Sequence, residues 1–173
     1  MCGIVSIHSS DNSLENMSLQ LDDMLKQILH RGPDGVGKVY IKDQVLLGHR
    51  RLAVIDLEHG QQPMVSEDGC YNLIFNGEIY NYLELRQLLL QRGVAFKTSS
   101  DTEVLLQMLI HFGSEALQEL NGMFAFIFHD GKRNEWIAAR DPFGIKPLYF
   151  YESDGYLYFA SEIKCFLANP KFQ

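Results

Sequence analysis

The sequence has 173 residues, which is long enough for one domain to bury a core without disulfide bonds or a structural metal. Apolar residues make up 46% of it and charged residues 21%, which is ordinary for a globular protein and excludes a disordered chain. The 15 Lys and Arg against 22 Asp and Glu give a net charge of −7, which argues against a nucleic-acid-binding protein.

Membrane insertion and secretion are not expected either. No apolar run approaches the ~20 residues that span a bilayer, and residues 1–10 lack the basic and apolar regions of a secretory signal. The three cysteines, Cys2, Cys70 and Cys165, are widely spaced and odd in number, which is typical of free thiols in a reducing compartment. We therefore expect a cytoplasmic protein.

The first half of the chain predicts a strand, a helix and two more strands. Residues 3–8 alternate between apolar and polar side chains, as a short strand does. Apolar residues in 21–29 recur at the spacing of one helix face, and Gly-Pro at 32–33 must end that helix. Residues 36–52 indicate two strands that turn at 42–43.

The second half predicts hairpins joined by helices. Asp-Gly pairs at 68–69, 130–131 and 154–155 supply the positive φ angles of tight turns, so the strands that flank each pair should be antiparallel. The runs rich in aromatic and β-branched residues are 123–129, 135–139, 148–151 and 156–160.

Two helices between these hairpins have readable ends. Asn81 with Glu84 predicts an N-cap for a helix over 83–91 that Gly93 stops, and Ser100 with Glu103 predicts a capping box for the next helix. Antiparallel strands in two groups, with helices between them, predict a layered α+β sandwich rather than a simple barrel.

Several motifs suggest chemistry without the context that it needs. Residues 32–38 match most of a phosphate-binding loop, but they lack the final Ser or Thr, and strand rather than helix follows, so we interpret them as a turn. The six histidines show no metal-binding spacing, and we interpret them as structural; no metal site is predicted.

Cys2 has a specific chemical possibility. If the initiator Met were removed, Cys2 would carry a thiol and a free α-amine, whose ordinary pKa of about 7.7–8.0 leaves part of it neutral near pH 7. That amine could accept the thiol proton without a histidine partner. The alternative is a cysteine that merely precedes a strand.

Further segments, distributed along the whole chain in order, resemble the class II glutamine amidotransferases, and among them the asparagine synthetase branch. They are Met-Cys-Gly-Ile-Val at 1–5, His-Arg-Gly-Pro-Asp-Gly at 30–35, Gly-His-Arg-Arg-Leu-Ala-Val-Ile-Asp at 48–56, Phe-Asn-Gly-Glu-Ile-Tyr-Asn at 75–81, Ser-Ser-Asp-Thr-Glu at 99–103, Asn-Gly-Met-Phe-Ala-Phe at 121–126, Arg-Asp-Pro-Phe-Gly-Ile-Lys-Pro-Leu-Tyr at 140–149 and Ala-Ser-Glu-Ile-Lys at 160–164. The resemblance implies the N-terminal-nucleophile hydrolase fold, a four-layer αββα sandwich with two mainly antiparallel sheets.

The resemblance also implies catalytic roles. Cys2 would attack the side-chain amide of L-glutamine, and the Asn76 amide with the Gly77 backbone N–H would stabilise the oxyanion. Asn-Gly is also the strongest signal for a type I′ hairpin turn, but here a strand precedes it and a helix follows.

The substrate-binding residues implied in the same way are Arg51, Leu52, Val54, Ile55, Glu78 and Asp101. Arg51 would bind the α-carboxylate, while Asp101 and Glu78 would bind the α-ammonium group. Asp101 could instead serve only the dipole of its helix. Arg31 could support the Cys2 end or be a plain helix-end arginine.

We expect residues 1–173 to be a glutaminase domain that needs no cofactor of its own. The ATP-dependent synthetase domain of the family, which would use ATP and Mg²⁺, has no counterpart here, so a synthetase domain or a partner chain would receive the ammonia. The sequence leaves two other functions open: a degenerate binding module of the same fold, or an N-terminal-Cys hydrolase of another amide.

Overall fold

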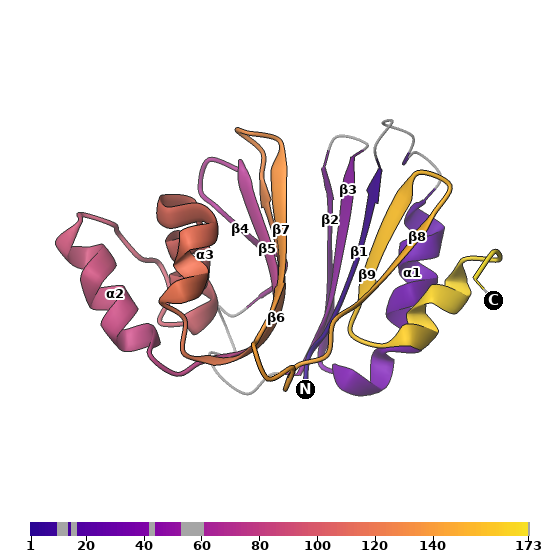
Figure 1. Cartoon of the computed structure of the whole chain (residues 1–173), viewed down its shortest axis with the longest axis horizontal. Coiled ribbons are helices and arrows are strands. Elements are labelled where there is room, and N and C mark those ends of the chain that lie inside the picture. The colour runs from indigo at the N-terminus through magenta and orange to yellow at the C-terminus, as the bar shows by residue number, and fades with distance from the viewer. Residues whose placement is uncertain (10–13, 15–16, 42–43, 53–60, 173) are drawn as a thin grey trace.

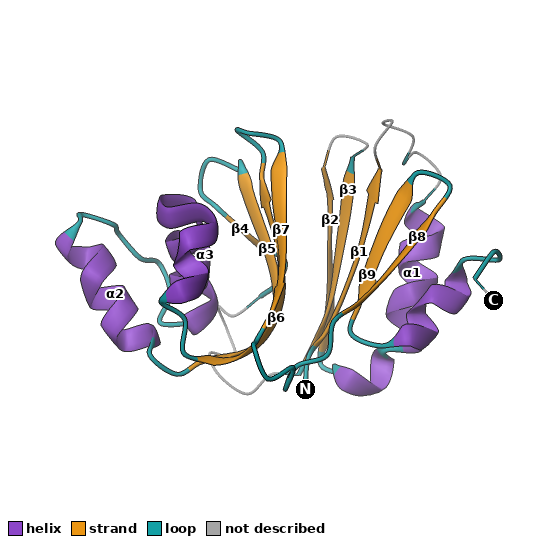
Figure 2. Ribbon diagram, in the orientation of Figure 1, coloured by secondary structure: helices purple, strands orange, loops and turns teal. Residues whose placement is uncertain are grey.

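The computed structural model describes residues 1–9, 14, 17–41, 44–52 and 61–172, which form four layers. Two β-sheets pack face to face, and helices cover the outer face of each sheet (Figures 1 and 2). The predicted αββα sandwich is therefore confirmed. No helix in the described part of the chain has the length and apolar character that crossing a bilayer requires.

The first sheet places the N-terminus at its centre. Its five antiparallel strands run in the order β2 (Gly35–Ile41), β3 (Val45–Arg51), β1 (Gly3–Ser9), β9 (Tyr156–Ala160) and β8 (Tyr149–Ser153). Strand β1 lies between β3 and β9 and is buried along nearly its whole length. The residue that precedes it, Cys2, is thus attached to the central strand of the sheet.

The second sheet has one strand with a partly open edge. Its antiparallel order is β4 (Met64–Val65), β5 (Tyr71–Ile79), β6 (Gly122–Asp130) and β7 (Glu135–Arg140). Strand β5 pairs with β6 without interruption, but β4 covers only Asn72 and Leu73 of β5. Among the strands of the described residues, none therefore pairs with the later part of β5 on its β4 side.

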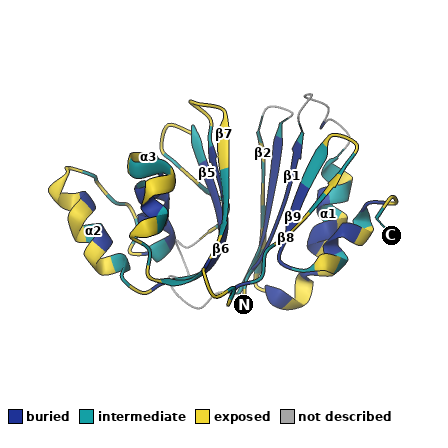
Figure 3. Ribbon diagram, in the orientation of Figure 1, coloured by how far each residue is buried: buried dark blue, intermediate teal, exposed yellow. Residues whose placement is uncertain are grey.

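Helices and sheets enclose three layers of buried apolar side chains. The segments that contribute buried residues are dark blue in Figure 3. Helices α2 (Tyr82–Gln91) and α3 (Asp101–Phe112) cover the second sheet, followed by a 3₁₀ helix at Gly113–Gln118. Helix α1 (Ser18–Gln27) and 3₁₀ helices at Leu29–Arg31 and Ile163–Ala168 cover the first sheet. The layer between the two sheets is apolar and contains Ile4, Val45, Leu47, Ile74, Ala125, Ile127 and Phe159.

Two predicted helix caps differ from the structure. Asn81 occupies the N-cap position of α2, but its side chain bonds the Glu119 carbonyl and the Asn121 N–H instead. Ser100 does cap α3 by accepting the Glu103 N–H at 3.2 Å. The second bond of the predicted capping box, from the Ser100 N–H to the Glu103 carboxylate, is wrong. The Glu103 carboxylate instead accepts the N–H groups of Lys97 and Thr98 in the preceding loop. In both cases, a tertiary partner replaces the local one.

The predicted hairpins form, with one change in turn geometry. Asp154 and Gly155 both have positive φ, and so does Gly69. In the β6–β7 hairpin, however, the positive φ belongs to Asn134 rather than to the Asp-Gly pair. The turn predicted at 42–43 lies outside the described residues. Residues 32–38 form a turn and strand β2, as predicted, rather than a phosphate-binding loop.

Two buried histidines should make stability depend on pH. Burial, with a smaller contribution from His129, lowers the pKa of His8 to about 3. Burial lowers the pKa of His49 to about 4, and the positive charge of Arg51 lowers it slightly further. A hydrogen bond to the Phe75 carbonyl, which joins the two sheets, acts in the opposite direction and raises the pKa. Both side chains are therefore neutral in the fold, and their contribution to stability is present above the unfolded pKa near 6.5.

We predict that the free energy of unfolding falls by about 2 kcal/mol per buried histidine between about pH 7.5 and pH 5, because the unfolded chain binds protons that the fold excludes. Urea unfolding at both pH values measures this change. Replacing the exposed His111 with Gln should leave the pH dependence unaltered. Equal urea midpoints at the two pH values would contradict the prediction.

Candidate active site

Cys2 is held by both its backbone and its sulfur. The Arg31 guanidinium donates from Nε to the Cys2 carbonyl at 2.9 Å and from Nη1 to the Glu162 carboxylate at 3.1 Å. The Cys2 sulfur lies 3.4 Å from the Leu52 nitrogen and 3.6 Å from the Leu52 carbonyl oxygen. Arg31 thus supports the Cys2 end, and the thiol is oriented toward the segment that leaves β3.

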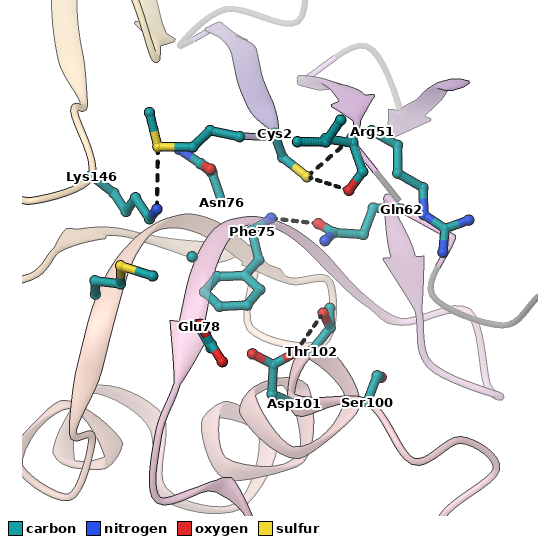
Figure 4. Close-up of a pocket in the computed structure, with 14 residues that line it drawn as sticks. Cys2, Arg51, Gln62, Phe75, Asn76, Glu78, Ser100, Asp101, Thr102 and Lys146 are labelled. Carbon is teal, nitrogen blue, oxygen red and sulfur yellow. Dashed lines mark hydrogen bonds between the residues drawn. The ribbon is translucent and has the colours of Figure 1, made fainter. Parts of the chain in front are cut away.

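The Cys2 thiol opens into a cavity of about 260 Å³ at the end where the two sheets converge. Figure 4 shows its wall, to which both sheets and the start of α3 contribute. The lining residues are Met1, Cys2, Arg51, Leu52, Gln62, Phe75, Asn76, Gly77, Glu78, Ser100, Asp101, Thr102, Met123 and Lys146. The cavity suits a ligand of amino-acid size rather than a larger molecule.

Asn76 provides a buried amide in this wall. It belongs to β5, and its side chain is on the face that packs toward the first sheet, as Ile74 is two residues earlier. Asn76 is 1% exposed, and its Nδ2 has no hydrogen-bond partner among the described residues. A buried donor without a partner costs about 1–3 kcal/mol, so this atom is available to a ligand of the cavity.

Gly77 follows in β5 and lies in the strand rather than in the alternative hairpin turn. A Cβ on Gly77 would lie 2.2 Å from the Met123 carbonyl oxygen, so only glycine fits between the strands. The N–H groups of Phe75 and Ile79 bond to side chains, Gln62 and Asp101, on the open side of β5. Because strand N–H groups alternate in direction, the Gly77 N–H points to that same side.

Charged groups of opposite sign lie on separate parts of the wall. Arg51 ends β3 and lines the cavity, whereas the preceding Arg50 turns away and donates to the Leu25 carbonyl at 3.1 Å. Successive side chains of a strand point to opposite faces, which separates the two arginines. In Figure 4, the Arg51 guanidinium lies apart from the carboxylates of Glu78 and Asp101.

Asp101 begins α3 and faces the cavity. Its carboxylate accepts the Ile79 N–H at 3.1 Å, which connects the helix to the end of β5. Burial raises the pKa of Asp101, the Ile79 and Thr102 N–H groups oppose that rise, and the nearby Glu78 adds to it. Two carboxylates in a small cavity favour a cationic ligand group between them.

The structure brings together all the predicted site residues that it describes. Cys2, Arg51, Leu52, Asn76, Gly77, Glu78 and Asp101 line the one cavity, while Val54 and Ile55 lie outside the described residues. Sequence reasoning missed Gln62 and Lys146; Lys146 falls in the quoted motif at 140–149, but no role was assigned to it. Among the described residues, no group of three or more His, Cys, Asp or Glu side chains could hold a metal ion.

A family model described as "Glutamine amidotransferase domain" matches residues 1–173. The chain belongs to this family. Glutamine-hydrolysing asparagine synthetase 1 of Bacillus subtilis is 46% identical over 167 residues, covering 95% of this chain and 26% of the relative. A probable glutamine-hydrolysing asparagine synthetase of Schizosaccharomyces pombe is 42% identical, covering 95% of this chain and 30% of the relative. This amidotransferase domain thus spans under a third of the length of either relative.

Solved structures agree with the family assignment. Glutamine phosphoribosylpyrophosphate amidotransferase from B. subtilis superposes with a TM-score of 0.76 at 27% identity, covering 96% of this chain and 43% of that one. An allosteric regulatory enzyme of purine biosynthesis gives a TM-score of 0.78 at 26% identity, with the same coverage. The fold is therefore that of the N-terminal-nucleophile amidotransferases, as predicted.

Proposed function

We propose that this amidotransferase domain hydrolyses L-glutamine to glutamate and ammonia, with Cys2 as the N-terminal nucleophile after loss of Met1. The observation that carries the proposal is the buried, unpartnered Nδ2 of Asn76 in the same cavity as the Cys2 thiol. An amide donor kept free of protein acceptors beside a nucleophile is what stabilisation of an oxyanion requires.

The reaction follows from these groups. The α-amine of Cys2 accepts the thiol proton as sulfur bonds to the carboxamide carbon of glutamine, and the negative charge moves to the carbonyl oxygen. The Asn76 amide and the Gly77 N–H donate to that oxygen. The C–N bond then breaks as the amine returns the proton to the leaving nitrogen, which releases ammonia and leaves a glutamyl thioester. Water attacks the thioester with the same amine as base, which yields glutamate and free Cys2.

The wall separates the binding of the two ionic ends of glutamine. The Arg51 guanidinium is suited to the α-carboxylate, because it can form two parallel hydrogen bonds with it. Asp101 and Glu78 supply the negative charge for the α-ammonium group, and Leu52 forms the wall beside the thiol. We include Val54 and Ile55 in the proposed site only by resemblance. The chemistry requires no metal or cofactor within residues 1–173.

The named relatives support a wider role. Because they are glutamine-hydrolysing asparagine synthetases, we propose that the ammonia passes to an ATP-dependent synthetase domain or partner chain that forms asparagine. Free thiols at Cys2, Cys70 and Cys165 support a cytoplasmic location. The family match and the intact set of site residues disfavour a degenerate binding module. Arg51 on one part of the wall and Asp101 with Glu78 on another match the two charged ends of a free amino acid, which disfavours a hydrolase of other amides.

A diazo-ketone analogue of glutamine tests the nucleophile directly. We predict one covalent adduct per processed chain, located on Cys2 by peptide mapping, and no adduct in Cys2→Ala. The other thiols are internal controls, because burial raises the pKa of Cys165 to about 12 and Cys70 lies outside the cavity. Labelling at Cys70 or Cys165 in place of Cys2 would refute the assignment.

Asp101→Asn separates ligand binding from folding. Asn can still accept the Ile79 N–H but carries no charge, so we predict that the KM for glutamine rises at least about tenfold. The urea midpoint near pH 7 should stay equal or increase, because burial disfavours the charged carboxylate. The matched control is Asp23→Asn, at an exposed position of α1, which should leave KM unchanged. An unaltered KM in Asp101→Asn would exclude the proposed contact.

A further inference from the structure

Lys146 is a buried cation that the proposed reaction has not used. It is 6% exposed, and it lines the cavity together with Cys2 and Asn76. Among the described residues, the only hydrogen-bond acceptor of its Nζ is the Met1 sulfur, at 3.3 Å, and no carboxylate forms an ion pair with it. A buried ammonium group without a counter-charge is costly, which points to a purpose within the cavity.

The loop that carries Lys146 is built to direct this side chain inward. The buried carboxylate of Asp141 accepts the N–H groups of Phe124, Phe143, Ile145 and Lys146 at 2.9–3.2 Å. Burial alone would raise the pKa of Asp141, but these backbone donors outweigh it and hold the pKa below its ordinary value. Phe143 is 90% exposed and Ile145 54% exposed, so Lys146 alone of the three turns into the cavity.

Lys146 contacts the residue whose removal creates the Cys2 α-amine. Its contact is with the side-chain sulfur of Met1, the residue that precedes Cys2, whereas the Cys2 sulfur contacts Leu52. Figure 4 shows Asn76 between Lys146 and the Cys2 sulfur. Removal of Met1 therefore takes away the described partner of Lys146 and creates a free α-amine at the wall of the same cavity.

We propose that Lys146 is a positioning residue for the proposed glutaminase reaction: its positive charge disfavours the protonated form of the Cys2 α-amine and so keeps the amine ready to accept the thiol proton. A like charge in the same small cavity raises the free energy of the protonated amine relative to the neutral one. Such an interaction is large enough to change the fraction of neutral amine near pH 7 by about tenfold or more.

Other charged groups around the cavity act on the same amine, and a variant of Lys146 leaves them in place. Arg31 binds the Cys2 carbonyl from the 3₁₀ helix after α1. The other charged groups are Arg51 at the end of β3, Glu78 in β5, Asp101 at the start of α3 and Asp141 in the loop after β7. The change on replacing Lys146 alone thus measures its own contribution.

The test compares wild type, Lys146→Met and Lys146→Arg, each with Met1 loss verified by intact mass. We expect the acid limb of the pH profile of kcat/KM for glutamine hydrolysis to move to higher pH by about one unit in Lys146→Met, because loss of the positive charge makes the amine easier to protonate. Lys146→Arg, which keeps the charge, should retain the wild-type limb. The control is Lys26→Met, where the lost charge is 70% exposed, and it should not move the limb.

A second readout does not need turnover. In chains labelled with ¹⁵N-cysteine, the Cys2 amine can be titrated by NMR, and Lys146→Met should raise its midpoint by the same amount as the kinetic limb. A uniform loss of kcat/KM with the acid limb and the NMR midpoint unchanged would overturn the inference. If wild type hydrolyses no glutamine but the midpoint shifts as expected, the proposed function fails, and only the effect of the Lys146 charge on the Cys2 amine stands.

Discussion

The proposed chemistry depends on one buried amide, that of Asn76. The layer between the two sheets is filled with apolar side chains such as Ile4, Ile74 and Ile127, and a polar group there needs a partner. Five buried side chains of the described chain carry a polar atom without a partner, and among them only Asn76 lines the cavity with Cys2. Folding alone gives no reason to keep such a group, whereas a negative charge that develops beside Cys2 gives one.

The rest of the structure holds the proposed nucleophile, Cys2, and the Asn76 amide in a fixed relation. Cys2 extends from the central strand of one sheet, and Arg31 fixes its carbonyl. Asn76 belongs to a long strand of the other sheet, β5, which pairs with β6 along its whole length. The His49 ring, which bonds the Phe75 carbonyl at 3.2 Å, ties the two sheets together next to that residue. Because Asn76 is in a strand and Cys2 directly precedes one, the separation of the two groups depends on how the sheets pack.

The sequence was sufficient to predict the parts of the site that local rules determine. The alternation of a strand separates Arg51 from Arg50, and a capping Ser places Asp101 at a helix start facing the cavity. Where a side chain has a choice of partners, local rules failed. Asn81 and Glu103 bond to other segments rather than cap their own helices, and the inward turn of Lys146 depends on four N–H groups held by Asp141. Such choices are decided by tertiary packing, which no short motif records.

The central claim is that the Cys2 sulfur forms a thioester with the side-chain carbonyl carbon of glutamine. Its most direct test is the intact mass of the processed chain, acid-quenched within one turnover after mixing with glutamine. The account predicts a glutamyl adduct on the wild-type chain that is absent from Cys2→Ala and decays as glutamate appears. Release of glutamate with no adduct at any quench time, from a chain whose Cys2→Ala variant is equally active, would contradict it.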